Sequence, residues 1–431
     1  MTEKGGSHRK AASGVVLVLL VEFAVLLLGL VALRLAATMG TDAFAEYAIG
    51  RRALQVLAFP VLMGVGVAIP RYVAADLSPT ADRARVLLGA GLMIVLPVMA
   101  FAAIALIVAG DRFQSLLFGP ESGASMTFPV TLGVAGLCLH VLAYAYFRGL
   151  MRWRSTAVLQ VVGVGLVPIV ALLGARGTPE RAVLLTGVGW IAVSGAVLLG
   201  VLRGGHMSPA ELRPAVTQLL RFGVPRVPGE LALFALFAVP VFLVANTQGL
   251  AAAGYLSLGL SVLSLATSMY SSLGVVLLPY VSRLAAAGNE RGAQSVVART
   301  LAGGVMLAAV VALVSVPLVP YATQRYLGGG FLEAVETVRV LLWATVPYVV
   351  YAILRNPLDA LRAWPHNSVN LVLAVLVISA LIWWGERVVT PAQAVFAGLL
   401  LLAGGSLVSW WRTGPVVRAP MPLKTGEAPS W

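Results

Sequence analysis

Long apolar segments separated by short polar breaks run through almost the whole chain. Each segment is about 20 residues long or longer, the length that an α-helix needs to cross the hydrocarbon core of a bilayer. Because lipid leaves no water to pair with an irregular backbone, runs of this kind predict helices. We expect twelve, near residues 13–36, 45–69, 85–109, 128–148, 156–174, 182–202, 222–245, 252–280, 297–320, 335–355, 368–385 and 391–411.

The longest polar stretch between these segments covers residues 203–221 and divides the chain near its middle. Leu212, Val216, Leu219 and Leu220 recur in it at helical spacing, which predicts a short amphipathic helix on the membrane surface. A plain linker and a regulatory element both fit this pattern. We expect a six-helix bundle over 1–202, a cytoplasmic amphipathic linker over 203–221, a second six-helix bundle over 222–411 and a cytoplasmic tail over 412–431.

The two halves resemble each other at an offset of about 208 residues. The matched pairs are Tyr47 with Tyr255, Gly66 with Gly274 and Glu22 with Glu230, and GVGVAIPRYVAA (64–75) matches LGVVLLPYVSRLAA (273–286) with short insertions. Six helices per half give both halves the same orientation. The repeat therefore predicts an all-α integral membrane protein whose two bundles are related by a pseudo-two-fold axis along the membrane normal, with a substrate path between them.

Charged residues are few, and the basic ones are distributed unequally between the two sides of the predicted membrane segments. Hydrophobic residues make up 59% of the chain and charged residues 11%, and the mean hydropathy is +0.93. Basic residues gather in every second break, twenty-one on one side against five on the other, so the positive-inside rule places both termini in the cytoplasm. The net charge of +13 is spread over short loops rather than gathered on one soluble face, so we expect no nucleic-acid partner.

A few charges lie inside the apolar segments, where an ionised side chain costs roughly 2.5 to 3.5 kcal/mol on insertion scales. Such residues are functional candidates because a membrane protein retains them at this cost. They are Glu22, Arg34, Arg51, Arg52 and Glu230.

Several segments resemble bacterial polysaccharide flippases. The first is LRLAATMGTDAFAEYAIGRRALQVLAFPVLMGVGVAIPRYVA at 33–74, and the second is the region 219–288, which begins LLRFGVPRVPGELALF. Shorter likenesses are FRGLMRWRSTAVLQ at 147–160 and LDALRAWPHNSVNLVLAV at 358–375. These flippases belong to the superfamily that also contains the multidrug and toxic compound extrusion antiporters.

The resemblance implies the movement of a polyprenyl-pyrophosphate-linked oligosaccharide from the cytoplasmic to the outer leaflet of a bacterial cell membrane. Membrane lipids, a polysaccharide polymerase and glycosyltransferases would then be its partners. A charged sugar head cannot cross hydrocarbon unaided, so such a protein needs a hydrated, cationic cavity.

Arg51, Arg52 and Gln55 form a polar wedge in the outer third of the second predicted helix. A guanidinium group matches phosphate well, so these residues and Arg34, at the outer end of the first helix, are candidates for binding the anionic head group. The alternative is that the arginines extend to the outer lipid headgroups, which lie about 10 Å away at 1.5 Å per residue. Both interpretations are open at this stage.

Glu22 and Glu230 lie about nine residues into their predicted helices, close to mid-depth. Because hydrocarbon disfavours charge, a carboxyl group at this depth suits a carrier that takes up and releases a proton. We expect ion coupling at Glu22, together with Glu230. The alternative is a neutral glutamic acid that donates a hydrogen bond between helices.

Two kinds of side chain are candidates for contacting sugar rings. Tyr144, Tyr348 and Tyr351 lie on two stripes that end in Arg148 and Arg355, where aromatic and basic anchoring at the membrane surface is an equally open explanation. A serine stripe in the eighth helix suits close helix packing, or else a sugar-facing lumen, and comprises Ser257, Ser261, Ser264, Ser268 and Ser271.

Enzymatic signatures are missing from the sequence. There is no GxxxxGK[ST] motif, and the four histidines have no metal-ligand spacing. We therefore expect no catalytic residues, no metal and no cofactor. The longest predicted outward loop, from Gly110 to Thr127, offers few reactive residues, which argues against a membrane glycan polymerase or ligase. A multidrug antiporter of the same fold remains the main rival, although it would favour an acidic lumen.

Overall fold

The computed structural model describes residues 3–74, 81–120, 122–204, 207–286, 289–361, 366–385 and 388–412. The predicted tail, apart from Arg412, lies outside these residues, as does the side chain of Ser271. Every element over the described ranges is helical. Within the described residues ten helices are long and apolar enough to cross a membrane, or twelve if each of two bent pairs counts as one span. The prediction of an all-helical, multi-span membrane protein is confirmed.

The N-terminal half consists of the helices that precede the predicted linker. They are α1 (Glu3–Ala37), α2 (Thr41–Leu62), α3 (Val65–Ala74), α4 (Ala81–Phe118), α5 (Thr127–Gly149), α6 (Trp153–Gln160), the π-helical segment η1 (Val161–Leu166), α7 (Val167–Gly174) and α8 (Pro179–Leu202).

The linker forms α9 (Pro209–Gly223), which leads through the short turn η2 (Val224–Arg226) into the C-terminal half. A capping box between Ser208 and Glu211 starts α9, and the helix buries Ala215 and Leu219 while packing on α3 and α4. The C-terminal half comprises α10 (Val227–Thr247), α11 (Leu250–Ala286), α12 (Glu290–Ala322), η3 (Thr323–Leu327), η4 (Gly329–Ala334), α13 (Val335–Trp343), α14 (Thr345–Leu361), α15 (His366–Trp384) and α16 (Pro391–Arg412).

Each predicted segment falls on a helix or on a bent pair of helices, but the continuity of two segments was wrong. The segment 45–69 is broken between α2 and α3 with a bend of 56°, and the segment 335–355 is bent by 40° between α13 and α14. At the first break Met63 and Gly64 have φ values of 48° and 72°. A Cβ on Gly64 would lie 2.5 Å from the Cα of Gly223, so glycine allows both the left-handed turn and the backbone contact.

The predicted outward loop 110–127 is also shorter than expected, because α4 continues to Phe118 through a non-helical residue at Gly110. The remaining loop is held by Glu46, whose carboxylate accepts hydrogen bonds from Ser122 Oγ, Gly123 N and Ala124 N at 2.9 to 3.2 Å. A carboxylate that binds two backbone N–H groups and a hydroxyl fixes this loop against α2.

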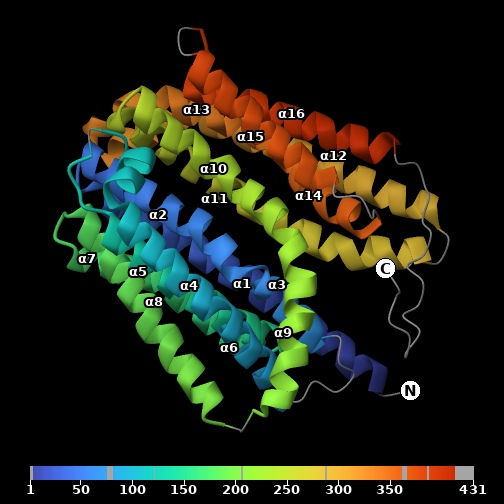
Figure 1. Ribbon diagram of the computed structural model, residues 1–431. Coiled ribbons are helices and arrows are strands. Elements are labelled where there is room, and N and C mark those ends of the chain that lie inside the picture. Colours follow the sequence, from blue (N-terminus) through green and yellow to red (C-terminus); the bar gives the residue numbers. More distant parts are fainter. Residues whose placement is uncertain are drawn as a thin grey trace.

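The two halves form two groups of helices that converge near the start of α2 and diverge towards α9 and the start of α1 (Figure 1). We call the first region the α1–α2 end and the second the linker end. In the region of convergence α2 packs on α10 and α11, and α4 packs on α10. At the linker end α3 packs on α4, α5 and α9, whereas α14 packs on its own half.

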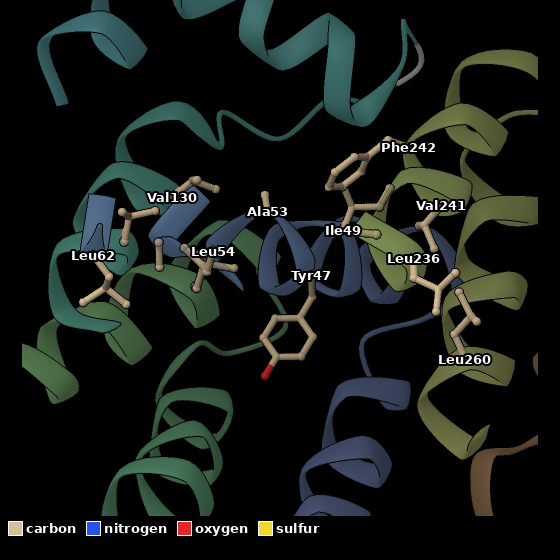
Figure 2. Close-up of a cluster of buried hydrophobic side chains, with 14 of the residues drawn as sticks. Tyr47, Ile49, Ala53, Leu54, Leu62, Val130, Leu236, Val241, Phe242 and Leu260 are labelled. Carbon is tan, nitrogen blue, oxygen red and sulfur yellow. The ribbon is translucent and has the colours of Figure 1, made fainter. Parts of the chain in front are cut away.

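The core at the meeting point of the halves is apolar and centred on α2. Ile49, Ala53 and Leu54 of α2 are buried; Ile49 lies beside Leu236 and Val241 of α10, whereas Leu54 lies beside Val130 of α5 (Figure 2). Aromatic contacts also join the halves. Phe44 meets Phe331 edge to face with 5.2 Å between ring centres, and Phe59 stacks on Phe234 with 3.9 Å between ring centres. This packing sets the surroundings of the arginines on α2.

Candidate functional site

Arg52 crosses from the N-terminal half to the C-terminal half. Its side chain is buried, with 8% exposed, and reaches α10 and α11. Nε donates to Ser257 Oγ at 2.9 Å, one terminal nitrogen donates to Phe237 O at 3.0 Å, and the other donates to Ser257 O at 3.0 Å and Ser261 Oγ at 3.4 Å. Arg52 therefore joins the two halves directly.

All of these acceptors are neutral. Among the described residues no carboxylate lies within ion-pair distance of Arg52. Hydrogen bonds satisfy the guanidinium donors, but its positive charge remains uncompensated in a buried interface. The serine stripe of α11 thus has a specific role at Ser257 and Ser261, which the sequence left undecided between packing and a lumen.

Arg51 and Gln55 lie on a different face of α2 from Arg52, and both are exposed. The Arg51 guanidinium carbon lies 5.9 Å from the centre of the Tyr47 ring. In Figure 2 the Tyr47 side chain points away from Ala53 and Phe242, so this face is distinct from the apolar contact with α10. The structure therefore separates the predicted wedge into a buried residue that bridges the halves and two accessible polar residues.

Arg34 lies in the last turn of α1, at the α1–α2 end, and is exposed. Its guanidinium carbon lies 5.4 Å from the centre of the Tyr326 ring, and Tyr326 Oη donates to Leu30 O at 2.9 Å. Because Tyr326 belongs to η3, this contact also links the two halves. Arg34 does not meet Arg51 or Arg52 in any recorded contact.

Glu22 is half-buried on α1, and both Glu22 and Arg148 act electrostatically on the hydroxyl of Tyr144 on α5. No arginine, lysine or histidine of the described residues lies within 4.0 Å of the Glu22 carboxylate. The N-terminal half therefore holds an acid, a tyrosine and an arginine near one another, with the acid outside an ion pair.

Glu230 differs from Glu22 in its place along its helix and in its partner. The structure places Glu230 in the first turn of α10 rather than nine residues into a helix, because that helix starts at Val227. Its Oε1 lies 3.7 Å from a terminal nitrogen of Arg355, in an ion pair whose side chains are 25% and 31% exposed. The expected spacing of about nine residues from the helix start is therefore wrong for Glu230.

The three candidate tyrosines are not equally accessible. Tyr144 is half-buried, whereas Tyr348 and Tyr351 are 9% and 1% exposed. Tyr348 contacts Phe237 edge to face at 5.5 Å and lies 5.9 Å from Tyr351. In this conformation these two rings are part of the core of the C-terminal half.

A repeated group of residues was missed at the sequence level. Tyr144 and Arg148 correspond to Tyr351 and Arg355 at an offset of 207 residues. This differs by one residue from the offset of 208 that relates Glu22 to Glu230. Each half therefore carries an acid on its first helix and a Tyr-x-x-x-Arg pair on a later one. The shared offset was the available signal, but only the structure shows that Glu230 pairs with Arg355 and that Glu22 and Arg148 both act on Tyr144.

Among the described residues no group of three or more His, Cys, Asp or Glu side chains could hold a metal ion. His140 instead packs against Gly163 and lies 3.3 Å from Ser194 Oγ, in a buried contact beside Trp190. Cys138 is buried and unpaired.

No family model matches the chain, and no curated protein matches it in sequence. The fold, in contrast, matches solved structures over nearly the whole chain. An inward-facing multidrug resistance MATE family transporter of the MOP superfamily has a TM-score of 0.71 at 12% identity, with 92% of this chain and 98% of the other covered. An outward-facing MATE family transporter has a TM-score of 0.61 at 14% identity, with 93% and 95% covered.

A MOP superfamily transporter from Pyrococcus furiosus also matches, with a TM-score of 0.61 at 15% identity and with 93% and 95% of the chains covered. Its description reports a binding pocket of reversed polarity that suggests a different function. This chain therefore has the fold of the MOP superfamily, and its structural neighbours are transporters. At these identities the likeness is one of fold, and the substrate has to be argued from the residues themselves.

Proposed function

We propose that this protein moves a polyprenyl-pyrophosphate-linked oligosaccharide from the cytoplasmic to the outer leaflet by alternating access of its two halves. The observation that carries the proposal is the uncompensated charge of Arg52 at the interface of the halves. A path lined by a cation without an acidic partner favours an anionic passenger, because such a charge repels cationic drugs and attracts phosphate.

The present conformation corresponds, in this proposal, to the inward-facing state. The sidedness of the basic residues makes the linker end cytoplasmic, and the contacts between the halves gather at the opposite end. The higher TM-score against the inward-facing relative supports the same assignment. The substrate would enter at the linker end and leave after the contacts of Arg52, Phe44 and Phe59 with the C-terminal half have opened.

The accessible face of α2 would bind the head group. Arg51 and Gln55 are exposed in this conformation and offer a cation and an amide one helical turn apart. Arg52 joins them only when it leaves Ser257 and Ser261, so an anionic head group competes with the contact that closes the α1–α2 end. Arg34 would act at the exit, after its contact with Tyr326 has opened.

Glu22 is the first candidate for ion coupling. A half-buried carboxyl group outside any recorded ion pair can take up a proton without breaking a salt bridge, whereas Glu230 is held by Arg355. Tyr144 is the accessible sugar contact. Tyr348 and Tyr351 would act in a conformation in which α14 and α10 have separated.

A multidrug cation antiporter is the second candidate, and Glu22 is the observation that favours it, since a half-buried acid outside an ion pair suits a cationic passenger. The solved structures that this chain resembles include a MATE multidrug transporter in complex with R6G. A membrane glycan polymerase or ligase is the third candidate. The outward region 110–127 argues against it, because much of that region is the end of α4.

Transport by the purified full-length protein in liposomes separates these candidates. One preparation contains a fluorescent polyprenyl-pyrophosphate oligosaccharide and another contains rhodamine 6G, a cationic dye. We expect the lipid-linked sugar to change leaflet and the dye to stay in place, and we expect Arg51→Ala with Arg52→Ala to abolish the movement. Dye efflux that survives this double substitution, without sugar movement, would establish the antiporter instead.

A further inference from the structure

Two arginines, one from the N-terminal half and one from the turn that leads into the C-terminal half, meet on one aromatic ring at the linker end. The guanidinium carbon of Arg71, in the last turn of α3, lies 4.3 Å from the centre of the Phe222 ring, and that of Arg226, in η2, lies 4.2 Å from it. Tyr72 supports the same ring in an edge-to-face contact at 5.7 Å. Phe222 is half-buried near the end of α9, whereas both arginines are exposed.

Neither cation has an acidic partner among the described residues. Three acids among the described residues near this end have partners of their own: Asp82 binds Arg85 at 2.7 Å, Glu211 accepts from Ser208 N at 3.2 Å, and Glu230 pairs with Arg355 at 3.7 Å. The ring stabilises each guanidinium group, but it does not remove the repulsion between two like charges that both lie within 4.3 Å of the same ring centre. An anion that contacts both guanidinium groups would do so.

The backbone keeps the two arginines together. Gly64, at the break before α3, and Gly223, at the end of α9, approach so closely that a Cβ on either would overlap the other segment. The positions of Arg71 and Arg226 therefore follow from the contact between the bent helix and the linker rather than from flexible loops. Because Arg71 belongs to the N-terminal half and Arg226 leads into the C-terminal half, a ligand here would bridge them.

We infer that Arg71, Phe222 and Arg226 form a binding site for the phosphate or diphosphate group of a lipid at the linker end. Guanidinium groups bind phosphate oxygens through paired N–H donors, and two of them match a group with several such oxygens. Basic pockets at the cytoplasmic side of membrane helices bind lipid headgroups in the same way. The inference does not depend on which substrate crosses the membrane.

Two lipids could supply this phosphate, namely a bulk anionic phospholipid and the diphosphate-bearing polyprenyl carrier. Native mass spectrometry of the full-length protein distinguishes them when it is titrated with phosphatidylglycerol, with polyprenyl pyrophosphate and with uncharged polyprenol. A preference for polyprenyl pyrophosphate over phosphatidylglycerol assigns the site to substrate loading. Equal affinity assigns it to headgroups of the surrounding leaflet. Both results support the phosphate site.

Arg71→Ala with Arg226→Ala should weaken binding of both phosphate lipids by about tenfold or more and leave polyprenol binding unchanged. The matched control is Arg213→Ala with Arg221→Ala, which removes the same charge from exposed positions of α9 and should change binding by less than about threefold. Phe222→Leu should give an intermediate loss, because the ring that holds both guanidinium groups is gone.

Two results would overturn the inference: unchanged binding in the Arg71/Arg226 variant, or an equal loss in the Arg213/Arg221 control, which would mean general surface charge. Arg71→Lys with Arg226→Lys, which keeps the charge, guards against misfolding, and a thermal unfolding curve is recorded for each variant. Sugar movement in liposomes is measured separately. A protein that transports normally but shows no phosphate preference would refute this site and leave the proposed function standing.

Discussion

The helices α2 and α11 occupy equivalent places in the two halves, and they pack against each other where the halves meet. α2 ends in a break with a 56° bend into α3, whereas α11 runs as a single helix from Leu250 to Ala286. At the offset of 208, Arg51 and Arg52 fall opposite Gly259 and Leu260. Both arginines are therefore on one copy, and the serines that accept from Arg52 are on the other.

This difference shows how a repeat can build a contact that neither copy could make with itself. If both copies carried arginine at this place, the two like charges would repel each other. If both carried serine, the contact between the halves would be weak. Arg52 against Ser257 and Ser261 gives a strong and reversible contact. The same contrast recurs between Glu230, which is paired with Arg355, and Glu22, which is not.

The largest expected effect follows from removing the cation of α2. Arg52→Ala should shift the equilibrium away from the closed α1–α2 end by about 3 kcal/mol, roughly a hundredfold, because several hydrogen bonds to a charged group are lost. Spin labels on Thr38→Cys and Leu332→Cys, in a Cys138→Ala background, would report a longer distance across this end. Arg52→Lys is the control and should shift the equilibrium less. An unchanged distance distribution would show that Arg52 does not hold the halves together.

The second effect concerns the unpaired acid. Glu22→Gln should lower the dependence of transport on a proton gradient by about tenfold or more, because the side chain can no longer gain or lose a proton. The measurement is the rate of sugar movement in liposomes with and without an imposed pH difference. Full gradient dependence in this variant would remove Glu22 from the coupling mechanism.

The break that distinguishes α2 from α11 can be tested through stability. Gly64→Ala should lower the unfolding free energy by about 2 kcal/mol, since a side chain would be strained at this positive φ and would overlap Gly223. Gly404→Ala on α16 is the control, where a Cβ meets no atom within 4 Å. Thermal unfolding in detergent should show a lower midpoint only for Gly64→Ala. Equal midpoints would mean that α2 and α3 can adopt a continuous path.

The smallest effect is expected from the paired acid. Glu230→Gln breaks a partly exposed ion pair, which is worth about 1 kcal/mol or less, so transport should change by less than about threefold. The assay is the one used for Glu22→Gln, which makes the two repeats directly comparable. A loss at Glu230 as large as that at Glu22 would contradict the asymmetry between the halves.

Much of the fold could be predicted from local patterns. Each apolar segment had to become a helix because lipid satisfies no backbone group, and this constraint acts on every segment independently of the others. The breaks were not predictable in the same way. The segment 45–69 is apolar throughout its second half, and the bend at Gly64 depends on a partner, Gly223, that lies far away in the sequence.

The candidate site was predictable in its residues but not in its geometry. The cost of charge in hydrocarbon singled out Glu22, Arg34, Arg51, Arg52 and Glu230 from the sequence. It could not tell Arg51 from Arg52, which differ by one position and about 100° around the helix. That rotation leaves one exposed and turns the other into a buried contact with α11.

The sequence by itself therefore determined that the chain is helical, spans a membrane many times and carries a few costly charges, because hydrophobicity and charge act residue by residue. Only the tertiary structure decided which partners the charged residues meet. Arg52 with Ser257, Glu230 with Arg355, and Arg71 with Arg226 on Phe222 are each joined across the fold. Such pairings depend on how helices from separate parts of the chain are rotated and bent against one another, which no local pattern specifies.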